Sequence, residues 1–271
     1  MKIMQQDSVL KTFVVAGVLC VVCSIFVATA AVALKPYQEA NKTLDKRVNI
    51  LVAAGLVDLS AGYPDAGEVE TLFECIRPIV VDMKSGAVFF DEESLHKAEN
   101  PSPGSEIAIA RENDVARVRH IPQYAFVYVY KDAGTPITTM RDLHSYAKRY
   151  VFPIEGQGLW ATMYGFIALE PDLNTISSIN FYQQGETAGL GGEIANPAWQ
   201  RKWVDKVVFA GKASEPTITI LKYGFPNERD DQVDGIAGST LTCKGVQNTV
   251  RFWLGQRGYG PFVNKIKMGD E

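Results

Sequence analysis

The feature that most limits how this chain can fold is an uncharged, apolar stretch near its N-terminus. Between Lys11 and Lys35 the sequence reads TFVVAGVLCVVCSIFVATAAVAL, residues 12–34. A helix of about 20 such residues crosses the hydrocarbon core of a bilayer, which is roughly 30 Å thick. A cleaved signal peptide is the alternative, because ATAAVA at 28–33 resembles a cleavage site, but its apolar region would be shorter. We predict a short tail at 1–11 and a retained transmembrane helix at 12–34.

The basic residues around this stretch indicate its orientation only weakly. Two lysines precede the stretch, and four basic residues follow it, namely Lys35, Lys42, Lys46 and Arg47. By the positive-inside rule this excess would place the C-terminal part in the cytoplasm. Glu39 and Asp45 partly offset it, so the charges do not settle the orientation.

The cysteines do not predict a metal or redox site. Cys20 and Cys23 form a CxxC inside the apolar stretch, where a zinc site would need more ligands and a thioredoxin-type motif would need a soluble domain. We interpret them as small apolar residues of the membrane helix, which in a complex could face a partner. Cys75 and Cys243 are isolated, and no disulfide between them is expected, since it would need a close approach in an oxidising compartment.

The rest of the chain has the composition of a globular domain. The 271 residues are 46% hydrophobic and 21% charged, with a formal net charge of −4, which gives no reason to expect a nucleic-acid partner. We predict a membrane-proximal helix or linker at 35–60, with apolar residues at helical spacing up to Gly62 and Pro64. Residues 61–271 are predicted to form one domain.

The pattern within this domain predicts an α+β fold with an antiparallel sheet flanked by helices. Alternating or β-branched segments predict strands at 77–83, 124–131, 159–169, 175–184 and 216–224. Asn196 as a cap and Pro197 after it predict one helix, and residues 242–256 predict the last one. Residues 96–120 are polar and predict a surface excursion.

The common catalytic motifs are absent from the sequence. His96, His120 and His144 lack the spacing of metal ligands, and we find no GxSxG, HExxH, GxxxxGK[ST] or GxGxxG. The sequence therefore does not indicate a hydrolase, an NTPase or a nicotinamide-binding enzyme.

Two glycine-rich stretches remain. GETAGLGGEI, 185–194, follows a predicted strand and could let the backbone approach a flat ligand, or it could be a mobile loop. DGIAGSTLTCKGVQ, 234–247, leads through two glycines and two hydroxyls into a helix. A helix N-terminus stabilises a phosphate, but Ser239 or Thr240 could instead simply cap the helix.

These two stretches resemble the C subunits of the sodium-translocating NADH:quinone reductase. The flavinylation motif of that family, approximately Asp-Gly-x-Ser/Thr-Gly-Ala-Ser/Thr, falls on residues 234–240, which include Asp234, Gly235 and Gly238 and end at Thr240. The family's Glu-Thr-Pro-Gly-Leu-Gly loop matches 186–191, with Ala188 in place of proline. Ala237 and Ser239 also depart from the motif, so Ser239 and Thr242 stay open as alternative acceptors.

The resemblance implies FMN attached through its phosphate to Thr240, by a flavin transferase that uses FAD. The residues it implies at the flavin are Trp160, Glu186, Thr187, Leu190, Gly191, Lys222, Ser239, Leu241 and Thr242. It further implies a one-electron carrier among the other subunits of the complex, on a single-pass anchor in the bacterial inner membrane, with a periplasmic domain. Trp160 could equally be a core residue, and Lys222 a solvated lysine at a strand end.

Two other functions fit the sequence less well. The G subunit of the Rnf complex also carries a flavinylated threonine, but FWLGQRGYGPF after the motif favours the quinone reductase. A membrane-anchored assembly or binding protein without a cofactor would use the hydroxyl-bearing turn only as a helix cap.

Overall fold

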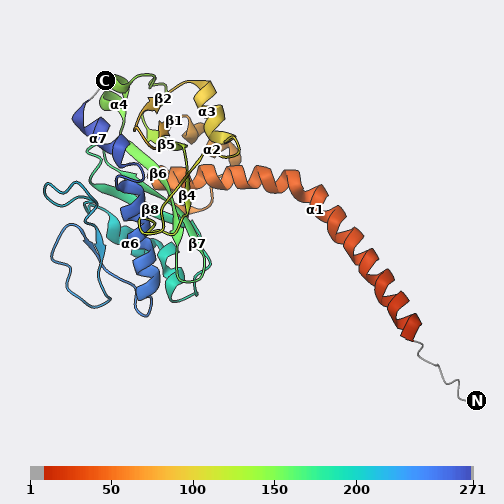
Figure 1. Ribbon diagram of the computed structural model, residues 1–271. Coiled ribbons are helices and arrows are strands. Elements are labelled where there is room, and N and C mark those ends of the chain that lie inside the picture. The colour runs from red at the N-terminus through yellow and green to blue at the C-terminus, as the bar shows by residue number, and fades with distance from the viewer. Residues whose placement is uncertain (1–8, 270–271) are drawn as a thin grey trace, which may run out of the picture. The chain divides into compact units, whose positions relative to one another are not determined.

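The computed structural model describes residues 9–269, and its first element is the long helix α1, Val9–Ala53 (Figure 1). The helix includes the whole apolar stretch and continues through Pro36. Within the described residues it is the one helix long and apolar enough to cross a membrane. It ends at Ala53 rather than at Gly62, because Gly55 adopts a φ of 74°.

The chain divides after Lys46 into two compact units, and the second is built on a six-stranded sheet. The strand order is β2-β1-β5-β6-β7-β8, and every neighbouring pair is antiparallel. Its strands are β1 (Ile76–Asp82), β2 (Val88–Phe89), β5 (Tyr124–Tyr130), β6 (Arg149–Gln157), β7 (Thr162–Leu169) and β8 (Ile176–Gln183). Two small sheets pair β3 (Glu106–Ala108) with β4 (His120–Pro122), antiparallel, and β9 (Thr219–Ile220) with β10 (Gln232–Val233), parallel.

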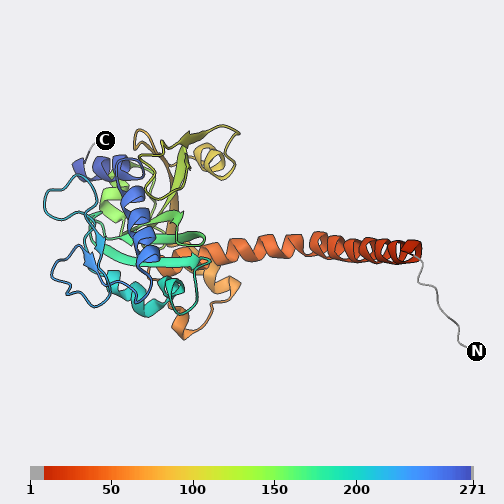
Figure 2. The same ribbon diagram turned by 60° about the horizontal axis from the view of Figure 1, so that its bottom comes forward.

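Helices lie around the sheet (Figure 2). The α-helices of this unit are α2 (Ala66–Phe73), α3 (Glu92–Glu99), α4 (Met140–Tyr146), α5 (Pro197–Gln200), α6 (Thr240–Leu254) and α7 (Gly260–Met268). Short 3₁₀ turns lie at Leu59–Ala61, Gly191–Ala195 and Arg201–Trp203. Asn196 caps α5 as predicted, since its side chain accepts a hydrogen bond of 2.9 Å from the Ala198 amide.

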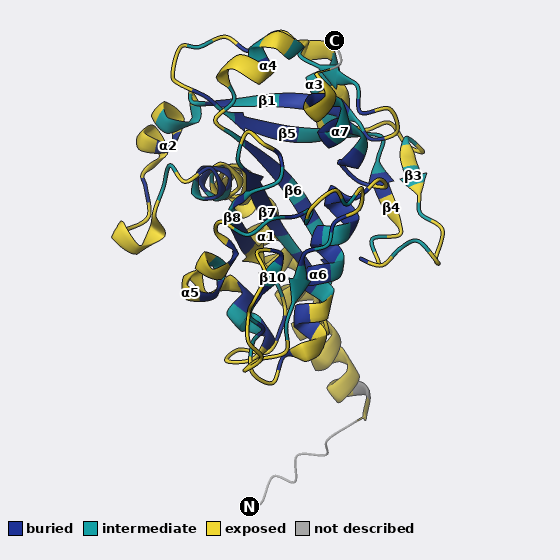
Figure 3. Cartoon of the chain, turned by 90° about the vertical axis from the view of Figure 1, so that its left-hand side faces the viewer, coloured by how far each residue is buried: buried dark blue, intermediate teal, exposed yellow. Residues whose placement is uncertain are grey.

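The sheet is buried on both faces (Figure 3). Consecutive residues of a strand point to opposite sides, and Ile79, Val80 and Val81 of β1 are all buried. On one face α6 and α7 cover the core: Trp253 Nε1 donates to the Glu155 carbonyl at 2.7 Å, and the rings of Phe152 and Phe262 lie 6.0 Å apart. On the other face the Ser178 hydroxyl donates to the Ala53 carbonyl at 2.6 Å. The last residues of α1 therefore pack against β8.

This architecture confirms the predicted α+β class with an antiparallel sheet and corrects several element boundaries. Strand β6 was not predicted as a separate strand, and β7 begins at Thr162 rather than at residue 159. The predicted strand at 216–224 is wrong, because β9 holds only two residues and lies outside the main sheet. The predicted helix 242–256 is α6, which starts two residues earlier, and α7 follows where no helix was predicted.

The remaining predicted segments are also more ordered than the sequence indicates. Residues 96–120 include the end of α3, the strand β3 and the first residue of β4, rather than an irregular excursion alone.

Cys75 and Cys243 are free thiols. Burial raises the pKa of the Cys243 thiol.

Candidate functional site

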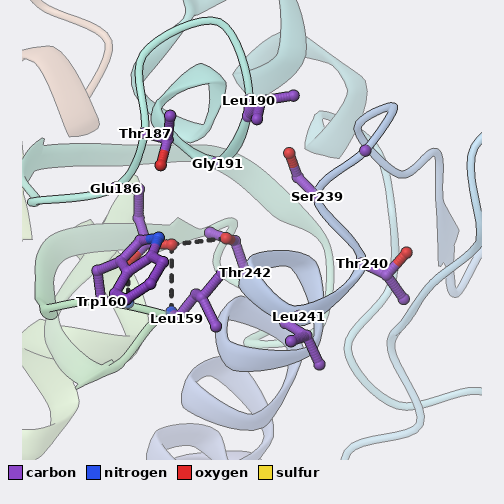
Figure 4. A pocket seen from close by; sticks show the side chains of 11 residues that line it. Leu159, Trp160, Glu186, Thr187, Leu190, Gly191, Ser239, Thr240, Leu241 and Thr242 are labelled. Atoms are coloured by element: carbon purple, nitrogen blue, oxygen red, sulfur yellow. Dashed lines mark hydrogen bonds between the residues drawn. The ribbon is translucent and has the colours of Figure 1, made fainter.

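A cavity of about 210 Å³ opens where three segments meet (Figure 4). These segments are the turn between β6 and β7, the loop after β8, and the N-terminus of α6. The residues that line it are Leu159, Trp160, Glu186, Thr187, Leu190, Gly191, Gly238, Ser239, Thr240, Leu241 and Thr242. The structure thus brings both glycine-rich stretches to one site, together with Trp160 from a different part of the chain.

Glu186 joins the three segments, with 9% of its surface exposed. Its carboxylate accepts hydrogen bonds from the amides of Leu159, Trp160 and Ala161, at distances between 2.9 and 3.3 Å. The Thr242 hydroxyl donates a further hydrogen bond of 2.6 Å to Glu186 Oε2 (Figure 4). Burial alone would raise the pKa of Glu186, but these hydrogen bonds outweigh it and hold the pKa below its ordinary value. The ionised carboxylate therefore ties the β6–β7 turn to α6.

The N-terminus of α6 faces the cavity with no side-chain cap. Ser239 is the N-cap residue, yet its side chain makes no capping hydrogen bond, and Oγ lies 3.4 Å from the Ala237 carbonyl instead. The first amides of a helix have no intrahelical acceptor, and the helix dipole adds a partial positive charge there. This end of α6 can therefore bind a phosphate, and the capping alternative for Ser239 is not what the structure contains.

The three neighbouring hydroxyls differ sharply in exposure. Thr240, the first residue of α6, is exposed, whereas Ser239 is 5% exposed and Thr242 only 1%. Figure 4 shows the Thr240 side chain on the side of the helix end away from Glu186, while Thr242 points toward Glu186. Of these three hydroxyls, that of Thr240 alone is therefore open to a second macromolecule without rearrangement.

The residues before Thr240 shape a tight turn. Gly238 has a φ of 71°, in the left-handed region that favours glycine. At Gly235 a side chain is excluded, because a Cβ there would collide with the Leu221 carbonyl. Asp234 forms an ion pair of 3.2 Å with Lys202, and its carbonyl accepts a hydrogen bond from the Trp199 indole.

Lys222 is the one predicted cofactor contact that does not line the cavity. It is exposed and follows Leu221, whose carbonyl lies against Gly235. The structure therefore places Lys222 beside the motif but outside the cavity. Leu159 is the reverse case: it lines the cavity, and only its position next to Trp160 in the sequence could have indicated it.

The lining matches the two ends of a flavin mononucleotide. Trp160, Leu190 and Leu241 are large apolar side chains, and 70%, 44% and 63% of their surfaces are exposed. Exposed apolar side chains beside an opening suit a flat aromatic ring. Gly191 packs tightly against the start of α6, since a Cβ there would lie 2.5 Å from Thr242 Oγ1. The uncapped end of α6 suits the phosphate.

Comparison with known proteins agrees with this chemistry. The family described as FMN-binding domain matches residues 158–255, a range that contains every residue lining the cavity. The C subunit of the Na(+)-translocating NADH-quinone reductase from Haemophilus ducreyi is 42% identical over 263 residues, covering 97% of this chain and 96% of the relative. The corresponding protein of Vibrio alginolyticus is 39% identical over 266 residues, covering 97% of each. This chain belongs to the family of these C subunits.

Solved structures of this family share the fold. Shewanella oneidensis NqrC matches with a TM-score of 0.69 at 27% identity, covering 84% of this chain and 99% of that one. The C subunit from Parabacteroides distasonis matches with a TM-score of 0.59 at 26% identity, covering 85% and 96%. The chain is thus a membrane-associated part of a multi-subunit oxidoreductase complex, with an FMN-binding domain, and the resemblance is confirmed.

Proposed function

We propose that this chain carries FMN covalently, through a phosphoester bond to Thr240 Oγ1. In the attachment reaction the Thr240 oxygen bonds to the phosphorus of the FMN half of FAD, the bond between the two phosphates of FAD breaks, and AMP leaves. The hydroxyl proton passes to a base of the flavin transferase, and no electron is transferred. The product keeps one negative charge at the N-terminus of α6, where the helix dipole stabilises it.

The exposure of Thr240 at an uncapped helix end is the observation that carries this proposal. A transferase must reach the acceptor hydroxyl, and the hydroxyls of Ser239 and Thr242 are buried. Thr242 is moreover engaged with Glu186, so using it would break a hydrogen bond to a charged group. Both observations favour Thr240 over the two alternative acceptors.

The proposed role is that of a one-electron carrier inside the Na⁺-translocating NADH:ubiquinone reductase. Electrons that originate from NADH would reach this protein from an iron centre in membrane subunits and leave to FMN on the large membrane subunit, ending on ubiquinone and driving sodium export. FMN supplies the redox chemistry when bound, and the protein positions it and tunes it by contacts alone. Trp160, Leu190 and Leu241 would hold the ring, and the first turn of α6 the phosphate.

The proposed location is the bacterial inner membrane, with α1 as a single-pass anchor and the FMN-binding domain in the periplasm. The apolar part of α1 supports the anchor, since the exposed large side chains between Val9 and Leu34 suit lipid or other subunits. A large domain is translocated largely regardless of modest flanking charge, so the basic residues after the apolar stretch do not oppose this orientation.

The test is denaturing gel electrophoresis of the complex under ultraviolet light, followed by assay of NADH:quinone reductase activity. Wild type is expected to show flavin fluorescence in the band of this protein, and Thr240→Ala to show a dark band and lost quinone reduction. Thr138→Ala, a threonine at the N-terminal side of α4, serves as a control that should keep both. A dark wild-type band from a host with the transferase would contradict the proposal and favour the cofactor-free anchored protein.

A further inference from the structure

A second and larger cavity, of about 810 Å³, has a cationic lining. Its charged and polar lining comes mainly from the loop between β3 and β4, and consists of Arg111, Asp114, Arg117, Arg119, His120 and Gln157. The chain as a whole has a formal net charge of −4, so three arginines around one cavity are a local departure from the overall negative charge. Nothing in the proposed flavin chemistry uses these residues.

The loop that carries the arginines is fixed by its own hydrogen bonds. The Asp114 carboxylate accepts hydrogen bonds of 2.8 Å from the amides of Val118 and Arg119. Arg117 and Arg119 have φ angles of 58° and 65°, a conformation that costs energy for residues other than glycine. Strained backbone of this kind persists where the surrounding structure holds it and is frequent at binding sites.

The arginine side chains are exposed and have no acidic partner within residues 9–269. Among the described residues, none of Arg111, Arg117 and Arg119 takes part in an ion pair, and the carboxylate of Asp114 is occupied by backbone amides. Guanidinium groups bind carboxylates through paired, charge-assisted hydrogen bonds. The loop therefore presents a set of cationic donors that the described part of the chain does not satisfy.

The position of this cavity ties it to the flavin site. The backbone amide of Gln157 donates a hydrogen bond of 2.8 Å to the Ala116 carbonyl, so the arginine-bearing loop is attached to the end of β6. The next residues along the chain form the turn that carries Leu159 and Trp160, which line the flavin cavity. A molecule seated among the arginines would lie next to that turn.

We propose that this cavity docks an acidic segment of a neighbouring protein of the reductase, one with at least two Asp or Glu side chains. Three exposed guanidinium groups around one cavity can pair with carboxylates spaced along a polypeptide, because each guanidinium can hold a carboxylate through two parallel hydrogen bonds. Complementary charges of this kind orient a partner and raise the association rate more than they raise affinity. The partner would thereby be held beside the flavin site of this chain.

The first test is the double variant Arg111→Glu/Arg119→Glu of the full-length protein, mixed in detergent with the rest of the complex. Wild type is expected to bind less tightly as salt rises, because screening weakens exposed charge pairs. The double variant is expected to bind at least tenfold more weakly at low salt, with a flatter salt dependence. The matched control is Lys84→Glu/Lys212→Glu, which reverses two exposed charges elsewhere. Equal binding by the two double variants would overturn the proposal.

Flavin fluorescence separates this inference from the flavin proposal. Both double variants should keep the fluorescent band, because neither changes a residue that lines the flavin cavity. Their melting temperatures should stay unchanged, because all the substituted side chains are exposed. A dark band in wild type would reject the flavin proposal without bearing on docking, whereas a fluorescent variant that still binds normally would reject docking alone.

The second test identifies the occupant directly, through a photoactivatable amino acid in place of Arg111 in the assembled complex. The expected crosslink is to a peptide of another protein of the complex, with at least two acidic residues near the crosslinked site. Crosslinks confined to phospholipid would overturn the proposal in favour of a membrane headgroup. Saturable binding of inorganic phosphate in the cavity, with assembly unaffected by the double variant, would overturn it in favour of a small-anion site.

Discussion

The Thr242 hydroxyl donates a hydrogen bond of 2.6 Å to the Glu186 carboxylate, across 56 positions of sequence. Both side chains are buried, and the same carboxylate also binds amides of the β6–β7 turn. This pair therefore holds the helix end that bears Thr240 against the turn that bears Trp160. Its integrity should control both the stability of the domain and the shape of the flavin cavity.

Removing the Glu186 side chain should destabilise the domain strongly. Glu186→Ala leaves the Thr242 hydroxyl and three backbone amides without their acceptor, and hydrogen bonds to charged groups contribute about 1.5–3 kcal/mol each in net terms. We expect the free energy of unfolding to fall by at least about 3 kcal/mol, as measured by denaturant titration in detergent. The control Glu228→Gln, at an exposed position, should change it by less than about 0.5 kcal/mol. A loss of similar size in both variants would contradict the assigned role of Glu186.

The lowered pKa of Glu186 also predicts how stability depends on pH. A carboxyl whose pKa is lower in the folded than in the unfolded state stabilises the fold above its unfolded pKa, and this contribution is lost as pH falls through the folded pKa. The stability difference between wild type and Glu186→Gln should therefore be largest near neutral pH and shrink below pH 4.5, the ordinary value for this carboxyl. Unfolding curves of both proteins from neutral pH down to about pH 3 check this. A difference that grows on acidification would show that Glu186 is protonated in the folded state.

A methyl group at Gly191 should disturb the same pair. A Cβ at this position would lie 2.5 Å from Thr242 Oγ1 and 2.9 Å from Glu186 Oε2, so the hydrogen-bonded atoms must move. Overpacking of this kind costs about 1–3 kcal/mol. Gly191→Ala should lower the free energy of unfolding by that amount and reduce the yield of flavin in the gel band. In the control Gly67→Ala, at the start of α2, the nearest atom to the new Cβ would be Asp65 Oδ1 at 3.3 Å, so both the stability and the flavin yield should stay near wild type.

The elements that a local sequence pattern describes were predicted correctly. The elements that were missed are those whose backbone groups form hydrogen bonds with side chains from distant parts of the chain. Strand β6 contains Pro153, which argues against a central strand. The ladder between β5 and β6 ends at Tyr128 and Val151, and the Tyr259 hydroxyl donates instead to the carbonyls of Phe126 and Pro153. No local pattern reveals that arrangement.

The predicted strand at 216–224 is wrong for a related reason. Arg251 on α6 donates to the carbonyls of Thr217 and Ile218, and the Gln247 side chain accepts from the Ile220 amide. Side chains of a helix thus replace the neighbouring strand that the alternating pattern predicts. In the case of α7 a local rule was available, because Pro261 in the first turn starts a helix as readily as it ends one.

The residues of the candidate site were predictable from the sequence, but the hydrogen bonds that join them were not. Glycines and hydroxyls indicated both loops, and the resemblance indicated Thr240 and Trp160. The engagement of Glu186 by Thr242 depends on tertiary contacts between distant segments. The arginines of the β3–β4 loop attracted no functional prediction, because a polar segment with prolines is typical of a solvated surface.

Asp234 and Lys202 allow recognition by the transferase to be separated from folding. Their ion pair is 3.2 Å long, but both side chains are 42% exposed, so it stabilises the fold by less than about 1 kcal/mol. Asp234→Asn and Lys202→Ala should therefore unfold close to wild type. We expect the transferase to recognise the Asp234 carboxylate itself, so only Asp234→Asn should lose the flavin, as judged by gel fluorescence. Loss of flavin in both variants would mean that the ion pair itself is required.

The most direct test of the central claim is peptide mass spectrometry of the protein isolated from its native host, with Ser239→Ala and Thr242→Val alongside. The account predicts a peptide heavier by FMN less one water, with fragment ions that place the addition on Thr240 in wild type and in both variants. Thr242→Val should also be less stable, because it removes the hydrogen bond to Glu186. An addition located on Ser239 or Thr242, or an unmodified peptide from a host that makes the transferase, would contradict the account.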